Sequence, residues 1–267
     1  MPEGDTLFRT AAVLRDILLG RTLVSARGRP GGAQLERLVG GRFLRVESIG
    51  KHLLIDVDRG LSLHTHLGLH GSWHRYRTGE PWRRGANRAV AVLEVPGAVA
   101  VCFDAPTVDL IETRALGLHP VLRALGPDLV TSEVATDALV GRLRALPPET
   151  PVGEALLDQR VMAGLGNVYR SEVCFVERVD PFRTLASLSD PTLAGLVETG
   201  RTLIRANRMA PARTTVPGAR RPGERLWVYG RAGRPCRRCG GVIQSRVGGD
   251  PPRRTWWCLT CQPGASG

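Results

Sequence analysis

The sequence lacks any long hydrophobic run. A helix that spans a membrane needs about 20 consecutive apolar residues, whereas the candidate stretch from Leu14 to Leu19 is interrupted by Arg15 and Asp16. The basic flank and small-residue cleavage site of a signal peptide are also missing near the N-terminus. We therefore expect a soluble intracellular protein with no membrane partner.

Lysine is almost absent. Lys51 is the only lysine among 37 basic residues, and all the others are arginine. An ammonium group is a compact donor on a flexible stem, and arginine does not replace it at every kind of site. Lys51 is therefore a candidate functional residue, although a single lysine can also occur by chance.

Acidic residues are scarce in the last quarter of the chain. From Arg201 onward there are 14 arginines but only two acids, Glu224 and Asp250, so this segment carries the whole net charge of +12. A cationic surface confined to one segment is typical of polyanion binding. We favour nucleic acid over the alternatives, which are a solvated face and an anionic membrane surface.

The first half of the sequence predicts a helix followed by strands. With 267 residues, 42% of them apolar, the chain is long enough for one large domain or two. Asp5 or Thr6 can cap a helix that ends near Gly20 and whose apolar residues share one face. These apolar residues are Leu7, Phe8, Ala11, Leu14 and Leu18.

Short apolar stretches separated by turns follow this helix, and their spacing favours an antiparallel β-sandwich. The predicted strands include Phe43–Ser48, His52–Asp58, Leu61–His66, Ala89–Val95 and Ala98–Phe103. The second half is predicted to be helical, with helices near Ser132–Leu146, Val152–Leu157, Asn167–Glu177 and Pro191–Asn207. A stretch rich in proline, arginine and glycine, residues 209–224, is predicted to be a mobile loop or linker.

Four of the six cysteines form the pattern of a zinc site. Two Cys-x2-Cys pairs, separated by 18 residues, consist of Cys236, Cys239, Cys258 and Cys261. This spacing suits four thiolates around a tetrahedral zinc ion, which we favour over disulfides. Between the pairs, Val242–Val247 and Arg253–Trp257 are predicted to form a hairpin too small to fold without the metal. Four thiolates leave zinc no open position, so its role is expected to be structural.

The two remaining cysteines, Cys102 and Cys174, lie in apolar runs and are expected in the core.

The first residues carry a candidate nucleophile. If Met1 is removed, Pro2 presents a free secondary amine, and an α-amino group has a pKa of about 7.7–8, which leaves a useful neutral fraction near neutral pH. Attack of this amine on a sugar C1′ gives an iminium cation, the electron sink that Schiff-base catalysis requires. Glu3 follows directly and is placed for proton transfer.

Several motifs occur together in one order along the chain. They are Pro2-Glu3-Gly4, Gly50-Lys51-His52-Leu53-Leu54, Gly164-Leu165-Gly166-Asn167-Val168-Tyr169, Val228-Tyr229-Gly230-Arg231 and the four-cysteine hairpin. In this combination the chain resembles the formamidopyrimidine-DNA glycosylase/endonuclease VIII family over essentially its whole length. Gly4, where the formamidopyrimidine branch has leucine, makes it similar to the endonuclease VIII branch, and to the actinobacterial members of that branch.

The resemblance implies an α+β fold in three parts. These are an N-terminal catalytic β-sandwich with a flanking helix (residues 1–125), a helix-two-turn-helix DNA-binding domain (126–222) and a zinc-finger hairpin (223–267), with DNA held between them. It also implies a monomer that acts on damaged DNA in the bacterial cytoplasm, associated with the nucleoid. One structural Zn²⁺ is the only cofactor implied.

The resemblance further implies a bifunctional DNA glycosylase and AP lyase that flips the damaged nucleotide out of the duplex. Pro2 would attack C1′ and Glu3 would protonate the sugar, after which β- and δ-eliminations cleave the strand. The residues that match the DNA-contacting positions of the family are Lys51, His66, Asn167 and Arg253, with Arg254 as a neighbour. Leu69, in Gly68-Leu69-His70-Gly71, matches the position of a wedge that fills the space left by the flipped base.

Three departures from the purine-specific branch favour oxidised pyrimidines as substrates. Asp5-Thr6 stands where many members have Pro-Glu, residues 104–109 show no Arg-Arg-Phe loop, and residues 209–224 show little likeness to the lid over an oxidised purine. Oxidised or ring-opened purines remain an alternative. A zinc-ribbon protein that binds DNA or RNA without catalysis is the alternative from another class.

Overall fold

The computed structural model describes residues 2–264, so Met1, whose removal the expected chemistry at Pro2 requires, lies outside the described residues. The chain divides into two compact units, one with the described residues up to Ala124 and the other from Leu125 onward. The expected boundary between a helical domain and a zinc hairpin near residue 222 falls within the second unit and stays a prediction. Among the described residues, no helix is both long and apolar enough to cross a membrane.

The first unit is built from one long helix, eight strands and short helical turns. The helices and 3-10 turns are α1 (Gly4–Leu18), η1 (Leu35–Leu38), η2 (Ala86–Arg88), η3 (Thr113–Leu118) and α2 (Pro120–Arg123). The strands are β1 (Ser25–Gly28), β2 (Phe43–Ile49), β3 (His52–Val57), β4 (Leu61–His66), β5 (Ser72–Arg77), β6 (Ala89–Val95), β7 (Ala98–Phe103) and β8 (Thr107–Glu112).

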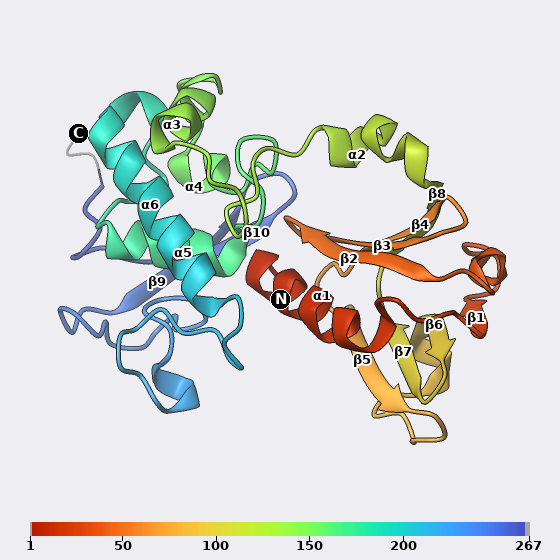
Figure 1. Ribbon diagram of the computed structural model, residues 1–267. Coiled ribbons are helices and arrows are strands. Elements are labelled where there is room, and N and C mark those ends of the chain that lie inside the picture. The colour runs from red at the N-terminus through yellow and green to blue at the C-terminus, as the bar shows by residue number, and fades with distance from the viewer. Residues whose placement is uncertain (1, 265–267) are drawn as a thin grey trace. The chain divides into compact units, whose positions relative to one another are not determined.

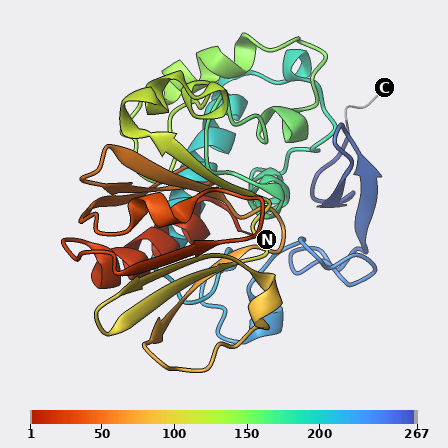
Figure 2. The same ribbon diagram turned by 90° about the vertical axis from the view of Figure 1, so that its right-hand side faces the viewer.

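These strands form two antiparallel sheets of four strands each, in the orders β1-β6-β7-β5 and β2-β3-β4-β8. Figures 1 and 2 show α1 between the two sheets, and one hydrophobic core joins the helix to both of them. The predicted antiparallel sandwich with a flanking helix is therefore confirmed.

The predicted cap of α1 is wrong. The helix begins at Gly4, and its N-cap is Glu3, which has an extended backbone and no side-chain cap. Asp5 lies inside the first turn with its side chain fully buried, so it cannot occupy the cap position. The apolar face is confirmed for Leu7, Ala11, Leu14 and Leu18, whereas Phe8 is only half-buried.

Three strands are absent from the prediction. β1 is only four residues long, β5 carries alternating polar residues, and no residue of β8 is fully buried. A short or polar strand gives a weak hydrophobic pattern, since its place depends on pairing with neighbours rather than on its own side chains. The five strands that were predicted lie close to the observed bounds of β2, β3, β4, β6 and β7.

The second unit is helical and ends in a hairpin. Its helices and 3-10 turns are α3 (Thr136–Arg144), α4 (Val152–Ala155), α5 (Asn167–Val176), η4 (Leu185–Ser187), α6 (Asp190–Asn207) and η5 (Pro222–Glu224). α3 begins four residues later than predicted, after Ala135 as its N-cap. α6 is capped by the Ser189 hydroxyl, which accepts a hydrogen bond from the backbone N–H of Thr192.

The hairpin consists of β9 (Ile243–Gly248) and β10 (Arg253–Cys258), paired antiparallel from Arg253 opposite Gly248 to Cys258 opposite Ile243. Figure 2 shows it as a twisted ribbon in the blue part of the chain. Both strands agree with the prediction to within one residue. Cys102 and Cys174 are fully buried, as expected for core cysteines.

Candidate functional site

A buried carboxylate directly precedes α1. Glu3 is fully buried, although it precedes the first helical residue. Its backbone carbonyl accepts hydrogen bonds from Thr6 (2.9 Å) and Leu7 (3.1 Å), so the main chain and not the carboxylate makes the cap contacts. Pro2 is half-buried and directly adjacent. The structure therefore sets the predicted nucleophile and the predicted acid side by side where the helix begins.

Lys51 lies in the tight turn between β2 and β3. Ile49 pairs with His52, so Gly50 and Lys51 alone form the connection. Gly50 has φ +58°, a left-handed conformation that favours glycine at the first position of such a hairpin turn. The side chain of Lys51 is half-buried, and this turn fixes its backbone at the end of the sheet.

Three histidines gather beside this turn, and only one of them, His66, was predicted as a site residue. His52 begins β3 and pairs with His66 on β4, and the two ring centroids are 4.9 Å apart. His52 Nδ1 is 2.9 Å from Nε2 of His64, two residues before His66. Burial, followed by the charge of Lys51, lowers the pKa of His66. The alternation of His64 and His66 along a strand was the signal available in the sequence.

The predicted wedge, Leu69, stands on a rigid loop. Its side chain is 60% exposed. Gly68 has φ +57°, and a Cβ there would lie 2.9 Å from Cγ of Pro106, so only glycine fits. Arg84 donates hydrogen bonds to the carbonyl of His70 (3.3 Å) and to Asp104 (2.7 Å). These bonds connect the loop to the end of β7, which Asp104 directly follows.

Arg84 and Asp104 are functional candidates that the sequence did not reveal, because their partners are distant along the chain. Asp104 also accepts hydrogen bonds from Arg88 at 2.9 and 2.6 Å. These bonds hold the pKa of the Asp104 carboxyl below its usual value. Asp104 thus holds Arg84 in place, and Arg84 binds the backbone of His70, the residue after Leu69.

In the second unit, the structure brings Asn167 together with the predicted zinc hairpin. Asn167 is the first residue of α5, after Gly166 as N-cap, and it is 5% exposed. Its Nδ2 donates to the backbone carbonyl of Arg254 (2.8 Å), and its Oδ1 accepts a hydrogen bond from Arg170. Arg170 also donates to the carbonyl of Arg254 (2.9 Å). The amide of Asn167 is therefore oriented by β10 and by Arg170, which the sequence analysis missed.

Arg253, the first residue of β10, borders a hollow of about 370 Å³ within the second unit. Arg160 and Arg170 line the same hollow, together with three carboxylates, those of Glu154, Asp158 and Asp250. Arg254 is not among the residues that line this hollow; it is exposed and donates to the hydroxyl of Ser245 (3.0 Å). Of the two neighbouring arginines, Arg253 is therefore the one with access to this hollow, whose lining carries both charge signs.

A buried carboxylate organises the connection to the hairpin. Glu172, on α5, is fully buried and accepts hydrogen bonds from the backbone N–H groups of Trp227 (2.7 Å), Val228 (2.9 Å) and Tyr229 (2.8 Å). The hydroxyl of Thr215 donates to the same carboxylate. Glu172 therefore holds the Val228-Tyr229-Gly230-Arg231 motif in place, and its role could not be read from the sequence because it binds main chain.

The stretch of residues 209–224 is irregular, as predicted, except for the single turn of η5. It is anchored at several points rather than free along its length. Asn207 at the end of α6 exchanges hydrogen bonds with Thr214, and the N–H groups of Thr215 and Val216 donate to the carbonyl of Arg225. Together with Glu172, these bonds close residues 216–224 into a tied loop.

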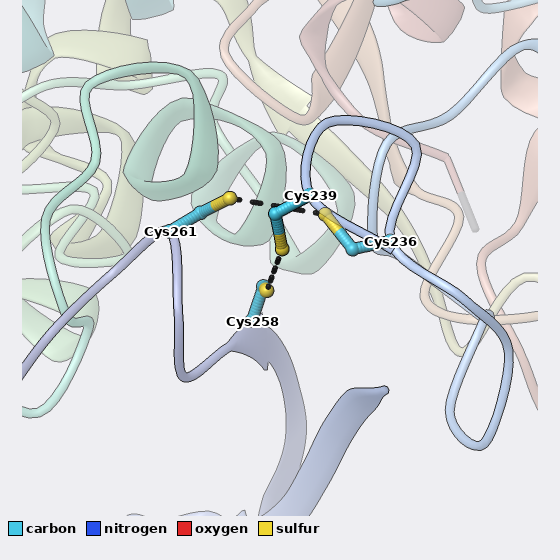
Figure 3. A group of neighbouring side chains, drawn as sticks. All are labelled: Cys236, Cys239, Cys258 and Cys261. Atoms are coloured by element: carbon cyan, nitrogen blue, oxygen red, sulfur yellow. Dashed lines mark hydrogen bonds between the residues drawn. The ribbon is translucent and has the colours of Figure 1, made fainter. Parts of the chain in front are cut away.

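The four predicted zinc ligands come together at the base of the hairpin. Figure 3 shows the side chains of Cys236, Cys239, Cys258 and Cys261 pointing toward one another. Their sulfurs all lie within 4.8 Å of one another. The Sγ atoms of Cys236 and Cys261 are 3.9 Å apart, and those of Cys239 and Cys258 are 3.5 Å apart.

These distances fit a metal site and not a pair of disulfides. A disulfide joins sulfurs at about 2.05 Å, whereas four sulfurs about 2.3 Å from a tetrahedral zinc ion are about 3.8 Å apart. Burial raises the pKa of the Cys261 thiol to about 12, and a bound dication would favour its thiolate. These four cysteines can therefore hold a metal ion.

Comparison with known proteins identifies the family. The formamidopyrimidine-DNA glycosylase N-terminal domain matches residues 1–117, and the formamidopyrimidine-DNA glycosylase H2TH domain matches residues 125–214. The chain belongs to the formamidopyrimidine-DNA glycosylase family, and the resemblance stated from the sequence motifs is confirmed.

Curated relatives match the chain from end to end. It is 41% identical to a probable endonuclease 8 2 of Streptomyces coelicolor, over 99% of this chain and 95% of that protein. It is also 41% identical to the DNA-(apurinic or apyrimidinic site) lyase Nei2 of Mycolicibacterium smegmatis, over 98% of this chain and 99% of that one.

Solved structures share the fold at lower identity. A Lactococcus lactis Fpg bound to DNA with an oxidized pyrimidine has a TM-score of 0.85 at 21% identity. The same enzyme bound to DNA with an abasic site has a TM-score of 0.84 at 21% identity. Each comparison covers 98% of this chain and 100% of the other.

We predict that acid destabilises the first unit through His52. Burial and the charges of neighbouring histidines and Lys51 lower the pKa of His52 from 6.5 to about 3. Between these values the unfolded chain binds a proton that the folded chain does not, so stability falls as the pH drops through this window. In His52→Asn, which keeps an acceptor but cannot titrate, the thermal midpoint should depend less on pH. An identical pH dependence in both proteins would contradict this assignment.

We also predict that the hairpin depends on its metal. After dialysis against a mild chelator, the protein should retain one zinc ion per chain, measured by mass spectrometry of the metal. Cys258→Ser should lose this ion and the tertiary circular dichroism of the hairpin tryptophans, because a structural zinc contributes directly to folding. Cys102→Ala is the matched control and should keep the metal. Zinc retention by Cys258→Ser would contradict the assignment of Cys258 as a ligand.

Proposed function

We propose that the protein is a DNA glycosylase with AP lyase activity that acts on damaged DNA in base excision repair. Its similarity to an AP lyase over the whole length of both chains supports this activity. The single observation that carries the proposal is the burial of the Glu3 carboxylate directly beside Pro2 at the start of α1. An acid next to an N-terminal secondary amine supplies both groups that base removal and Schiff-base formation need.

The reaction begins with the N-terminal amine of Pro2, once Met1 has been removed. Its nitrogen lone pair forms a bond to C1′ of the damaged nucleotide, and the base leaves with the electrons of the glycosidic bond. The bonded nitrogen then loses its proton, and its lone pair opens the sugar ring by breaking the bond between C1′ and O4′, while Glu3 delivers a proton to O4′. Because the nitrogen of proline is secondary, the resulting imine is a cationic iminium. This cation accepts electrons when the proton at C2′ is lost, which expels the 3′ phosphate. A second elimination expels the 5′ phosphate, and water then releases the sugar fragment from the enzyme.

The DNA-contacting residues of the proposal come from both units. Lys51 and His66 belong to one end of the β2-β3-β4 sheet, where an ammonium and an imidazole can meet phosphate oxygens. Asn167 and Arg253 belong to the second unit, where Asn167 donates a hydrogen bond to the carbonyl of Arg254, the residue after Arg253 on β10. Leu69, carried on its rigid loop, is the proposed wedge that replaces the stacking of the flipped base.

The metal in this proposal is zinc, because four thiolates in a closed tetrahedral set are the usual ligands of a structural zinc ion. We further propose oxidised pyrimidines as the main substrates and a monomer acting at the bacterial nucleoid. The anchored 209–224 loop, whose sequence differs from the purine lid of relatives, supports the pyrimidine assignment over ring-opened or oxidised purines.

Borohydride trapping tests the proposed nucleophile. With DNA that contains an abasic site, the protein should form a covalent adduct that survives denaturation. A variant with an uncleaved N-terminal extension should form none, because its Pro2 nitrogen is an amide with no basic lone pair. The matched control carries the same extension at the C-terminus and should be trapped like the native protein. Tight DNA binding without an adduct would favour the non-enzymatic zinc-ribbon alternative.

Glu3→Gln should separate the two activities. Removal of a general acid lowers the rate of base excision by about 10²–10⁴-fold, whereas cleavage of a preformed abasic site should be largely retained, since its sugar is open for part of the time. Single-turnover rates on both substrates measure the difference. Asp16→Asn, on the exposed side of the same helix, is the control. If Glu3→Gln lowers both rates equally, the assigned role is wrong.

Arg253→Ala tests the phosphate contact in the second unit. Loss of one phosphate contact should weaken binding similarly across DNA sequences and reduce the slope of log affinity against log salt by about one. Arg114→Ala removes the same charge from a side chain that is 87% exposed on the first unit, and it should leave the slope unchanged. An unchanged slope in Arg253→Ala would show that Arg253 is a solvated surface residue that contacts no phosphate.

A further inference from the structure

A second group of metal-ligating side chains lies in the first unit, separate from the four cysteines. It consists of His64, Asp109 and His119, and one ligand atom from each lies within 4.8 Å of the other two. Neither the proposed chemistry at Pro2 nor the proposed DNA contacts use these residues.

The topology of the sheet brings the three residues together. His64 on β4 pairs directly with Asp109 on β8. After β8 the chain turns through η3 and returns, so that His119 lies against β4 with its ring centroid 5.2 Å from that of His64. The pairing of β4 with β8 and the turn through η3 thus bring together three ligands that are up to 55 residues apart in the sequence.

His64 is the decisive member of this group. It is 2% exposed, and its Nδ1 has no hydrogen-bond partner. Its Nε2 is 2.9 Å from Nδ1 of His52. When Nε2 carries the ring proton and donates it to His52, the lone pair of Nδ1 faces the carboxylate of Asp109. A buried acceptor opposite a carboxylate is unfavourable unless a cation lies between them.

The separation of these two atoms suits a metal ion better than a proton. His64 Nδ1 and Asp109 Oδ2 are 3.4 Å apart, which is longer than the usual N–H···O range of about 2.7–3.2 Å. With these two atoms 3.4 Å apart, a zinc ion about 2.05 Å from the nitrogen and about 2.1 Å from the oxygen would have an N–Zn–O angle of about 110°. That angle is tetrahedral.

We propose that His64, Asp109 and His119 bind a divalent cation of the zinc class through two imidazole nitrogens and one carboxylate oxygen. The side chain of Asp109 is 50% exposed and His119 is half-buried, so water can complete the coordination and the ion can exchange with solvent. The ligands are harder than four thiolates, which suits Zn²⁺, Ni²⁺ or Cu²⁺.

The surroundings supply the supporting contacts of a metal site. A ligating histidine commonly donates its other ring N–H to an acceptor that fixes its orientation, and Nδ1 of His52 is placed to accept it. His119 must give up its present hydrogen bond from the backbone N–H of Leu122, because a neutral ring has only one lone pair for the metal. This bond is long, at 3.3 Å, and caps a helix of four residues. The bound ion would connect β4, β8 and the segment before α2.

Metal content measures this site directly. The chelator-treated protein, which retains its cysteine-bound zinc, is incubated with ZnCl₂, freed of excess by gel filtration, and analysed for zinc per chain. We expect the content to rise by one equivalent. In Asp109→Asn and His119→Ala this second equivalent should be lost. Cu²⁺ loaded in place of zinc should show nitrogen hyperfine splitting from two imidazoles in electron paramagnetic resonance.

Matched variants distinguish this site from surface binding. Glu112→Gln removes a carboxylate from the same strand, and His70→Ala removes an exposed histidine of the same unit; both should keep the second equivalent. His52→Leu should weaken zinc binding by about 10–100-fold, and His52→Asn, which restores an acceptor, should recover it. A wild-type protein that gains no zinc, or a second zinc that persists in both ligand variants, would overturn the proposal.

Discussion

The packing of α1 between the two sheets fixes where the amino terminus of the chain lies. Leu7, Ala11, Leu14 and Leu18 bury one face of the helix, so its first turn cannot shift without exposing this core. Glu3 is fully buried and directly precedes the first helical residue, so its backbone position is set by the same helix. The position of Pro2, and with it the proposed chemistry, therefore depends on the hydrophobic packing of the whole of α1 (Gly4–Leu18).

The second unit achieves a comparable rigidity with polar groups. Glu172 binds three successive backbone N–H groups and a hydroxyl, and Arg254 offers its carbonyl to both Asn167 and Arg170. A buried carboxylate with this many donors has its desolvation compensated, and the segment that donates is held in one conformation. Together with the four-cysteine cluster, these bonds connect α5, the irregular 216–229 segment and the hairpin.

The sequence predicted the elements with strong local patterns and missed the contacts made by long-range pairing. The apolar face of α1, the central strands and the cysteine hairpin carry periodicity or spacing that a short window reveals. Strand β8 and the roles of Arg84 and Glu172 depend on partners more than ten residues away, and the N-cap Glu3 makes no side-chain cap contact that a sequence pattern would signal. The same limit applies to the histidine group, since His64 and Asp109 become neighbours only through the register of β4 and β8. The domain boundaries and the roles of Lys51, His66 and Asn167 stay predictions.

The attachment point of the sugar tests the central claim most directly. After borohydride reduction of the complex with abasic DNA, nuclease and protease digestion leave a peptide that carries the reduced deoxyribose fragment. Mass spectrometry should place that fragment on the nitrogen of Pro2, with no residue before it. A fragment on the side chain of Lys51, or active protein whose Pro2 is still preceded by methionine, would contradict the account.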